Sequence, residues 1–463
     1  MIIKNTNRLF IKKAASFFSN IVTNNVTILL NEIKTNRTIE HNTLNLNHYK
    51  NKRPSNEQKR NYNNGALHKD KVMYLIKNVH TIDIREKGIL NNISNLLKKH
   101  INELNIEEMY LVIHTFSKLK FIKYSLYNNI IKNIINKKPL MNTRTLTQML
   151  LDLHKLSALD LNVLTFFTQH YIINSFYNFT LFDITMILYI FNKYNYNDAT
   201  VVSQICKTIQ ECFLPFINED KGVLTTILLS LTMLSLNYDF YLNLLEKYVY
   251  NKYEQFEIKY LCNIAYSIAL WLANQPVQHK HITITTDKNI NDDKLQHNSK
   301  ELLITMLNDI VSLLLKNMHK LKNEELKQVH IALYYLNVIG MRYENNIKTI
   351  EKKNIKNNIT TSRMQDQIEK IFKELGVKVE KEIPVGPYML DFALKKRKIC
   401  IEINGFTHYY TSNGKINAKT NLKYFILNKL NWKVVTIEYM DWKNKKKEEK
   451  IKYIETNVLD KIK

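Results

Sequence analysis

The chain has 463 residues, of which 67 are Lys or Arg and 42 are Asp or Glu, so its formal net charge is +25. This length predicts two or three domains. Such a positive surplus favours polyanionic partners, nucleic acid first, although an abundance of Lys and Asn also reflects a skewed composition. The four cysteines form no Cys-x-x-Cys pair, which argues against a disulfide framework or a zinc site. No apolar stretch reaches the ~18 residues of a membrane-spanning helix.

The first segment, residues 1–31, interleaves Lys and Arg with Ile, Leu and Phe, and no acidic residue precedes Glu32. A basic, acid-free and amphipathic N-terminus is typical of a presequence for organellar import, and the segment lacks the apolar core of a secretory signal. We therefore predict a mitochondrial presequence at 1–31 and a mitochondrial location. Residues 32–69 are polar and rich in Asn, and we predict a disordered linker there.

Residues 70–345 show helical periodicity in which a similar apolar segment recurs. Its copies, with steps of 37, 38, 40, 37 and finally 65 residues, begin at Val112, Met149, Ile187, Ile227, Ile264 and Val329. A polar insertion at 274–300 accounts for the longer step. A second apolar helix follows each copy, and helix pairs of this period bury their apolar faces by stacking. The sequence predicts an α-solenoid, whose extended concave surface suits single-stranded RNA or a protein partner.

The pattern changes again in the last part of the chain, where we predict a basic linker at 346–362 and a separate domain at 363–463. Periodicity, turn residues and β-branched runs predict these elements in order. They are a helix at 363–376, strands at 377–383, 388–394 and 398–404, a helix at 416–430, a strand at 432–439 and a helix at 443–462. The whole chain is thus predicted to be multidomain, an α-solenoid followed by a small α/β sandwich.

Two acids lie within the predicted strands of this domain, Asp391 in the second and Glu402 in the third. Neighbouring carboxylates bind Mg²⁺ through oxygen, and the ion can activate water and steady a leaving phosphate. This is the arrangement of the PD-(D/E)xK nuclease core, but the uncharged Asn404 stands where the lysine is expected. Lys419 or Lys423 from the next helix could replace that lysine, and His408 could act as a base. The alternative is that Asp391 and Glu402 accept hydrogen bonds in a domain that only binds.

Residues 365–460 resemble the RAP domain, an RNA-binding domain abundant in apicomplexans. The stretches that carry the resemblance are "FKELGVKV", "GPYMLDFAL", "CIEINGFTHYY" and "NWKVVTIEYMDWK". The matching positions are Leu375, Gly376, Asp391, Glu402, Gly405, His408, Thr411, Gly414, Lys415, Trp432, Asp441 and Trp442. Two positions depart from the pattern: Asn404 stands where Asp is usual, and Asn431 where Gly usually precedes the Trp.

The resemblance implies a restriction-endonuclease-like fold in an organellar protein that acts on RNA. It also implies octotricopeptide- or heptatricopeptide-like repeats before the domain, which agrees with the predicted solenoid. A mitochondrial protein that binds ribosomal RNA or transcripts, in RNA processing, RNA stability or the mitochondrial ribosome, is the function that this favours. The alternatives are a Mg²⁺-dependent endoribonuclease that uses Asp391 and Glu402, and a scaffold that holds mitochondrial ribosomal proteins.

Cationic side chains are the first candidates for RNA contacts, because Lys and Arg supply most phosphate contacts. We predict such contacts from one clamp made of Lys395, Lys396, Arg397, Lys398, Lys415, Lys419 and Lys423. His408 and Tyr409 are expected beside it, and Tyr409 and Tyr410 are candidates for stacking on bases. Binding alone needs no cofactor, so Mg²⁺ is expected only if the domain cleaves RNA.

Overall fold

The computed structural model describes residues 69–78, 86–274, 290–352 and 362–462. The predicted presequence at 1–31 and the predicted linker at 32–69, except for its last residue, lie outside these ranges, as does part of the insertion at 274–300. The chain divides into two compact units, residues 1–178 and 179–463, and each is treated by itself.

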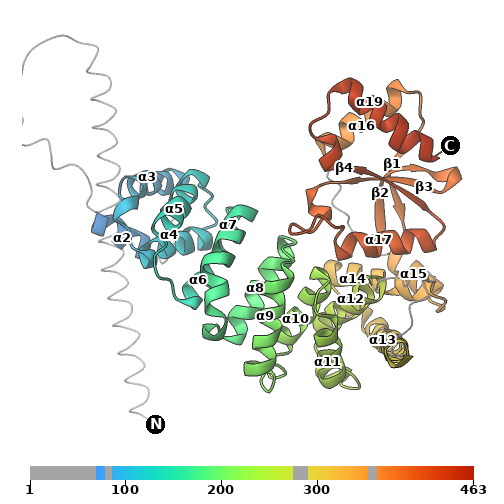
Figure 1. The fold of residues 1–463 in the computed structure, drawn as a ribbon, viewed down its shortest axis with the longest axis horizontal. Helices are drawn as coiled ribbons and strands as arrows, with labels where there is room; N and C mark the ends of the chain where they lie inside the picture. Colours follow the sequence, from blue (N-terminus) through green and yellow to red (C-terminus); the bar gives the residue numbers. More distant parts are fainter. Residues whose placement is uncertain (1–68, 79–85, 275–289, 353–361, 463) are drawn as a thin grey trace, which may run out of the picture. The chain divides into compact units, whose positions relative to one another are not determined.

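The first unit is helical (Figure 1). Its helices are α2 Lys69–Asn78, α3 Lys87–Lys99, α4 Ile106–Lys118, α5 Tyr124–Lys137, α6 Thr143–Lys155 and α7 Leu161–Phe167. The sequence sets their ends locally. Asn105 accepts a hydrogen bond from the backbone N–H of Glu108 in a capping box that begins α4, and left-handed Lys138 ends α5. Alternate helices pack on one another, α2 on α4 and α4 on α6.

A buried carboxylate joins α4 to α6. Asp152 is almost fully buried, and its oxygens accept from His114 Nδ1 at 2.7 Å and from Ser117 Oγ at 2.8 Å. Because a buried charge is costly without such donors, this network fixes how the two helices face each other.

The second unit begins with eight helices among the described residues. They are α8 Leu181–Lys193, α9 Ala199–Thr208, α10 Lys221–Leu234, α11 Tyr238–Tyr248, α12 Ile258–Asn274, α13 Ile290–Lys316, α14 Asn323–Val338 and α15 Glu344–Glu351. Here too alternate helices pack together, α8 on α10, α10 on α12 and α12 on α14. No described helix is long and apolar enough to cross a membrane.

The helical content predicted for 70–345 is confirmed. The helices α4, α6, α8, α10 and α12 start 37, 38, 40 and 37 residues apart, so each recurring apolar segment lies in the first helix of a pair. Helix α13 begins at Ile290, inside the polar stretch 274–300, and α15 reaches into the stretch 346–362 that we predicted to be a linker.

The second unit ends in a four-stranded mixed sheet, made of β1 Glu380–Val385, β2 Tyr388–Leu394, β3 Ile399–Asn404 and β4 Lys433–Glu438. The strand order is β1-β2-β3-β4, with β3 and β4 parallel and the other pairs antiparallel. Around it lie α16 Arg363–Glu374, α17 Ala418–Lys429, α18 Tyr439–Trp442, α19 Lys447–Ile454, a π-helical turn Glu455–Leu459 and α20 Asp460–Ile462. Helix α17 is the crossover between the two parallel strands.

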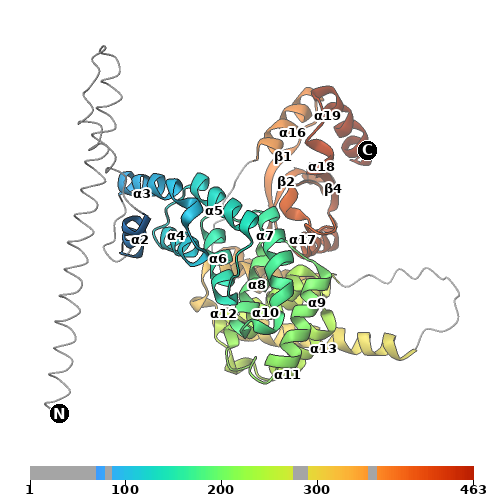
Figure 2. The same ribbon diagram turned by 60° about the vertical axis from the view of Figure 1, so that its left-hand side comes forward.

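The sheet is covered on both faces, which is why its inner strand β3 is buried along its whole length. Phe372 of α16 and Ile454 of α19 pack on one face, against Ile401 of β3. Leu427 of α17 packs on the other face, against Cys400. Figures 1 and 2 show α17 on the side of the sheet opposite to α16 and α19.

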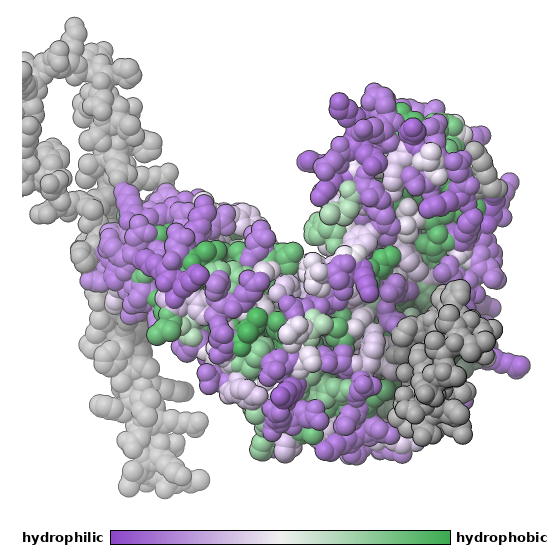
Figure 3. Space-filling view, viewed as in Figure 1, coloured by the Kyte–Doolittle hydropathy of each residue, from purple (hydrophilic) through white to green (hydrophobic). Residues whose placement is uncertain are grey.

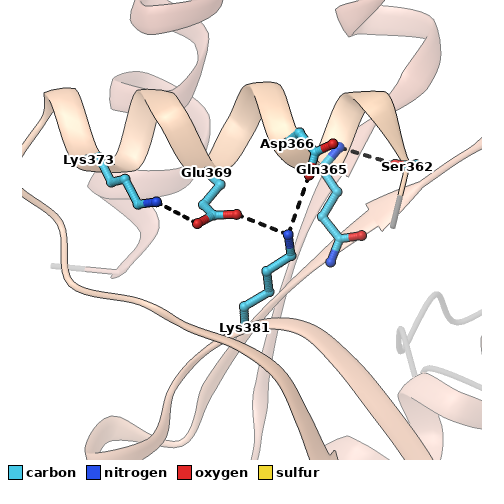
Figure 4. Close-up of polar contacts among 6 residues, drawn as sticks. All are labelled: Ser362, Gln365, Asp366, Glu369, Lys373 and Lys381. Atoms are coloured by element: carbon cyan, nitrogen blue, oxygen red, sulfur yellow. Dashed lines mark hydrogen bonds and ion pairs between the residues drawn. The ribbon is translucent and has the colours of Figure 1, made fainter. Parts of the chain in front are cut away.

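Helix α16 is tied to β1 by a chain of charges (Figure 4). Lys373 Nζ lies 2.7 Å from one oxygen of Glu369, and Lys381 Nζ of β1 lies 2.9 Å from the other. The hydrogen bonds from Lys373 and Lys381 lower the pKa of Glu369 to about 2. Ser362 begins the helix by accepting from Gln365 N at 3.1 Å. The contacts hold α16 in register with the edge of the sheet.

Candidate functional site

Asp391 lies where the β2–β3 ladder stops. The ladder ends at the pair Phe392 and Ile401, and beyond it the Asp391 Oδ2 atom accepts from the backbone N–H of Ile403 at 2.8 Å. The carboxylate therefore takes the place of a backbone acceptor on β2. This is a structural role for the acid, and it also places Asp391 close enough to Glu402 for their charges to interact.

Glu402 is 2% exposed, and a lysine compensates its charge. Lys423, in the middle of α17, forms an ion pair with Glu402 Oε2 and donates to the backbone O of Met389 at 3.2 Å. Burial raises the pKa of Glu402, and the charge of Lys423 opposes that rise. The other oxygen, Oε1, is buried without a hydrogen-bond partner. Lys423 thus brings to Glu402 the positive charge that Asn404 does not supply.

Asn404 connects three elements at the end of β3. It is fully buried, accepts from Tyr424 OH at 2.7 Å and lies 3.3 Å from both carboxylate oxygens of Glu438 through Nδ2. Burial raises the pKa of Glu438. An Asp at position 404 would place a second carboxylate against Glu438, so the amide fits where the family pattern has an acid.

His408 is half-buried, and its Nδ1 lies 3.1 Å from Thr420 Oγ1. Burial, and then the nearby Lys423, lowers its pKa, which favours a neutral imidazole. Within the described ranges, no group of three or more His, Cys, Asp or Glu side chains lies where it could hold a metal ion.

Basic side chains gather at the opposite end of the sheet. Lys395, Lys396 and Arg397 form the turn between β2 and β3, and Lys398 ends it in a left-handed conformation with a φ of 49°. Lys398 O accepts from Lys433 N at 2.8 Å, and Lys398 Nζ donates to Leu430 O at 3.4 Å, next to the end of α17. We call this group the basic end; all its side chains are exposed, and it consists of Lys395, Lys396, Arg397, Lys398, Lys429 and Lys433.

The structure divides the predicted clamp into two groups. The basic end lies where β3 begins, whereas Lys415, Lys419, His408 and Tyr409 lie beyond the point where β3 ends. At about 3.3 Å per residue, the strand separates the two groups by roughly 17 Å. Lys415 and Lys419 are exposed, and Tyr409 is half-buried with a buried hydroxyl.

The loop after β3 is fastened to the helices of the second unit. Tyr410 OH donates to Met233 O at 2.8 Å, lies 2.8 Å from the hydroxyl of Ser235, and accepts from Ala418 N at 2.9 Å. Thr411 N donates to Asn195 O at 3.0 Å. Tyr410, which we named as a candidate for stacking on bases, is buried, and its hydroxyl bonds to the end of α10.

Helix α17 also contacts the helices of the second unit. Asn274 Nδ2 donates to Ala418 O at 3.0 Å, and the rings of Tyr335 and Phe425 stack with centroids 5.3 Å apart. Gly386, with a φ of +57°, turns between β1 and β2, and a Cβ there would lie 2.9 Å from the ring of Tyr334. Sequence reasoning missed these contacts because they join residues far apart in the chain. The sequence did hold one signal: the helix predicted at 416–430 has apolar residues on both sides, which indicates that it packs against two partners.

A comparison with protein families agrees with the resemblance seen in the sequence. The family model of the RAP domain matches residues 401–457. The match runs from β3, with Glu402, through α17 and β4 into the π-helical turn after α19. This part of the chain is therefore identified as a RAP domain, a type of domain that indicates RNA binding in general.

Proposed function

We propose that the protein binds RNA and that the basic end contacts the phosphate backbone. The observation that carries this proposal is the RAP domain match at 401–457, whose segment contains Lys429 and Lys433. Four more cations, at 395–398, lie at the same end of the sheet. Exposed Lys and Arg side chains contact phosphates and gain affinity by releasing counterions. Glu380, the first residue of β1, is an acid at this end of the sheet, because it pairs with Ala393 of β2.

We further propose that the helices form a solenoid that carries more of the RNA, and that the protein acts in mitochondria on ribosomal RNA or transcripts. The regular steps between α4 and α12 and the packing of alternate helices support the solenoid. The basic composition of 1–31, a segment outside the described residues, supports the location. A fluorescent-protein fusion with and without residues 1–31 tests the location, because only the full chain is expected in mitochondria.

The binding proposal is tested with the full chain and a single-stranded RNA, followed by fluorescence anisotropy over a series of KCl concentrations. Replacing the four basic residues at 395–398 by Gln should weaken binding by about tenfold or more and flatten the salt dependence, since each lost contact removes about 0.7 from the slope. The matched control replaces Arg363, Lys370, Lys378 and Lys452, four exposed cations elsewhere in the domain, by Gln.

The control should change affinity much less than the basic-end variant. Equal losses in both variants would show that only the overall charge matters. Absence of RNA binding by the unaltered chain would reject the proposal. Association of that chain with mitochondrial ribosomal proteins in the absence of RNA would then favour the scaffold.

A second candidate is a Mg²⁺-dependent endoribonuclease, favoured by the ion pair that places Lys423 on Glu402 beside Asp391. If Mg²⁺ is bound there, Asp391 and Glu402 would supply oxygen ligands, and the ammonium of Lys423 would stabilise charge on the phosphate. Asp391→Asn separates the structural role of Asp391 from its role as a metal ligand. The amide oxygen still accepts from Ile403 N, but the negative charge that would bind Mg²⁺ is lost. This activity predicts Mg²⁺-dependent cleavage that Asp391→Asn abolishes without loss of RNA binding. Cleavage that is absent, or that survives the substitution, would contradict it.

A further inference from the structure

Large apolar side chains protrude just beyond the carboxyl ends of β3 and β4. Phe406 is 71% exposed and Met440 is 62% exposed. The rings of Phe406 and Tyr439 meet edge to face, with centroids 6.5 Å apart and an interplanar angle of 66°. The parallel register explains why they are neighbours: Asn404 pairs with Glu438, so the residues that follow each strand emerge at the same edge. We call Phe406, Tyr439 and Met440 the aromatic edge.

The backbone that carries Phe406 is firmly held. Phe406 begins a short 3-10 turn, Phe406–His408. The carbonyl oxygen of Thr407 in this turn accepts from Asn195 Nδ2 at 3.0 Å and from Asn417 Nδ2 at 2.8 Å. Tyr439 begins α18 directly after β4. The exposed ring of Phe406 therefore stands on a rigid base, which lowers the entropy lost when a flat ligand stacks on it.

The surroundings of the aromatic edge are polar and basic. Figure 3 shows a largely hydrophilic surface over the C-terminal region, with small hydrophobic patches. Three lysines follow Tyr439 closely in the chain: Lys443, which is exposed, and then Lys445 and Lys446. One acid, Asp441, lies between Tyr439 and Lys443. Three apolar side chains make a patch far smaller than the ~800 Å² that each partner usually contributes to a stable protein interface. The aromatic edge therefore suits a single flat ring whose phosphate lies near these lysines.

We propose that the aromatic edge is a stacking platform for an unpaired base of RNA. The inference rests on the proposed RNA binding and assigns it a second contact, at the end of the sheet opposite to the basic end. Aromatic side chains stack on any base, because every base presents a π-face, and Phe406 is the ring most open to such contact. The edge-to-face partner Tyr439 sets the orientation of Phe406. An RNA strand bound at both places would span the length of the domain between the two ends of the sheet.

The test uses the full chain and a single-stranded RNA. Phe406→Ala should weaken binding by about tenfold, as expected for one lost stacking contact, while the salt dependence stays unchanged. Phe406→Trp should keep the affinity, and its indole fluorescence should be quenched by single-stranded RNA but not by a duplex of the same sequence. Phe216 is a matched control, because it is 54% exposed and lies outside the C-terminal region. Phe216→Ala should bind like the unaltered chain, and Phe216→Trp should show no quenching.

The possible outcomes separate this inference from the proposed function. If the unaltered chain binds no RNA, the proposed function fails and the inference fails with it. If that chain binds RNA with the expected salt dependence but Phe406→Ala binds equally well, only the stacking platform is rejected. The platform is also rejected if Phe406→Trp does not retain affinity, or if Phe406→Ala lowers self-association in light scattering and leaves RNA binding unchanged.

Discussion

Glu402 is a buried carboxylate on a strand, and an ion pair compensates its charge. One of its oxygens pairs with Lys423, a lysine that follows it by 21 residues and lies on the crossover helix α17. Removing one partner of a buried pair is costly because the remaining charge is left without compensation. The sequence indicated that Lys419 or Lys423 could approach this acid, and the ion pair is made by Lys423, one turn further along α17 than Lys419.

Lys423→Met keeps the length of the side chain but removes its charge, so it should destabilise the fold by about 2–4 kcal/mol. The double variant Lys423→Met with Glu402→Gln should recover part of that loss, since no unpaired charge remains. Urea unfolding followed by circular dichroism measures both. Equal stability of the single and double variants would show that the unpaired charge of Glu402 is not the source of the loss.

At the scale of elements, helix α16 and strand β1 depend on the carboxylate of Glu369. Lys373 and Lys381 depress its pKa to about 2, below the value of about 4.3 that is usual for an unfolded chain. A carboxyl with a depressed pKa stabilises the fold above its unfolded pKa, and this contribution is lost as the pH falls through the folded value. The salt-bridged state therefore holds from neutral pH down to about 4.3 and disappears toward about 2.

Glu369→Gln should accordingly lower stability at pH 7 and lose this effect progressively as the pH approaches 2. Chemical unfolding over a pH series measures the difference from the unaltered chain. Glu380→Gln, at an exposed position at the start of β1, is the matched control and should change stability little at any pH. A pH-independent difference for Glu369→Gln would contradict the assignment.

Much of the element order was predictable from sequence, for identifiable reasons. The apolar period marked the first helix of each pair, Gly376 marked the end of α16, and β-branched runs marked β2, β3 and β4. The split of the cations was not predictable. The position of each cation depends on which end of β3 lies next to which end of α17. Sequence spacing does not show this, so Lys395 and Lys419 were predicted to belong to one group. The aromatic edge also requires the parallel register of Asn404 with Glu438.

At the scale of the whole molecule, the C-terminal sheet and the helices of residues 179–463 form one unit. Helix α17 packs on the sheet with one side and on α12 and α14 with the other. Tyr410 fastens the loop after β3 to the end of α10 through its contacts with Met233 O and Ser235 Oγ. The RAP domain and these helices should therefore unfold together.

Tyr410→Phe removes the hydroxyl and leaves the buried groups at Met233 and Ala418 without their partner, at a cost of about 1–3 kcal/mol. Hydrogen exchange should then increase in two places far apart in sequence, the end of α10 and the loop 405–417. Tyr409→Phe is the matched control, because the buried Tyr409 hydroxyl has no hydrogen-bond partner. Faster exchange in the loop alone would show that the two parts do not unfold as one.

The central claim is that one RNA strand contacts both ends of the sheet of the RAP domain, the basic end and the aromatic edge. The most direct measurement is ultraviolet crosslinking of the full chain to bound single-stranded RNA, with the crosslinked peptides identified by mass spectrometry. We predict crosslinks in the peptide around 395–398 and in the peptide that contains Phe406. Crosslinks confined to α16 and α19, on the far face of the sheet, would contradict the account.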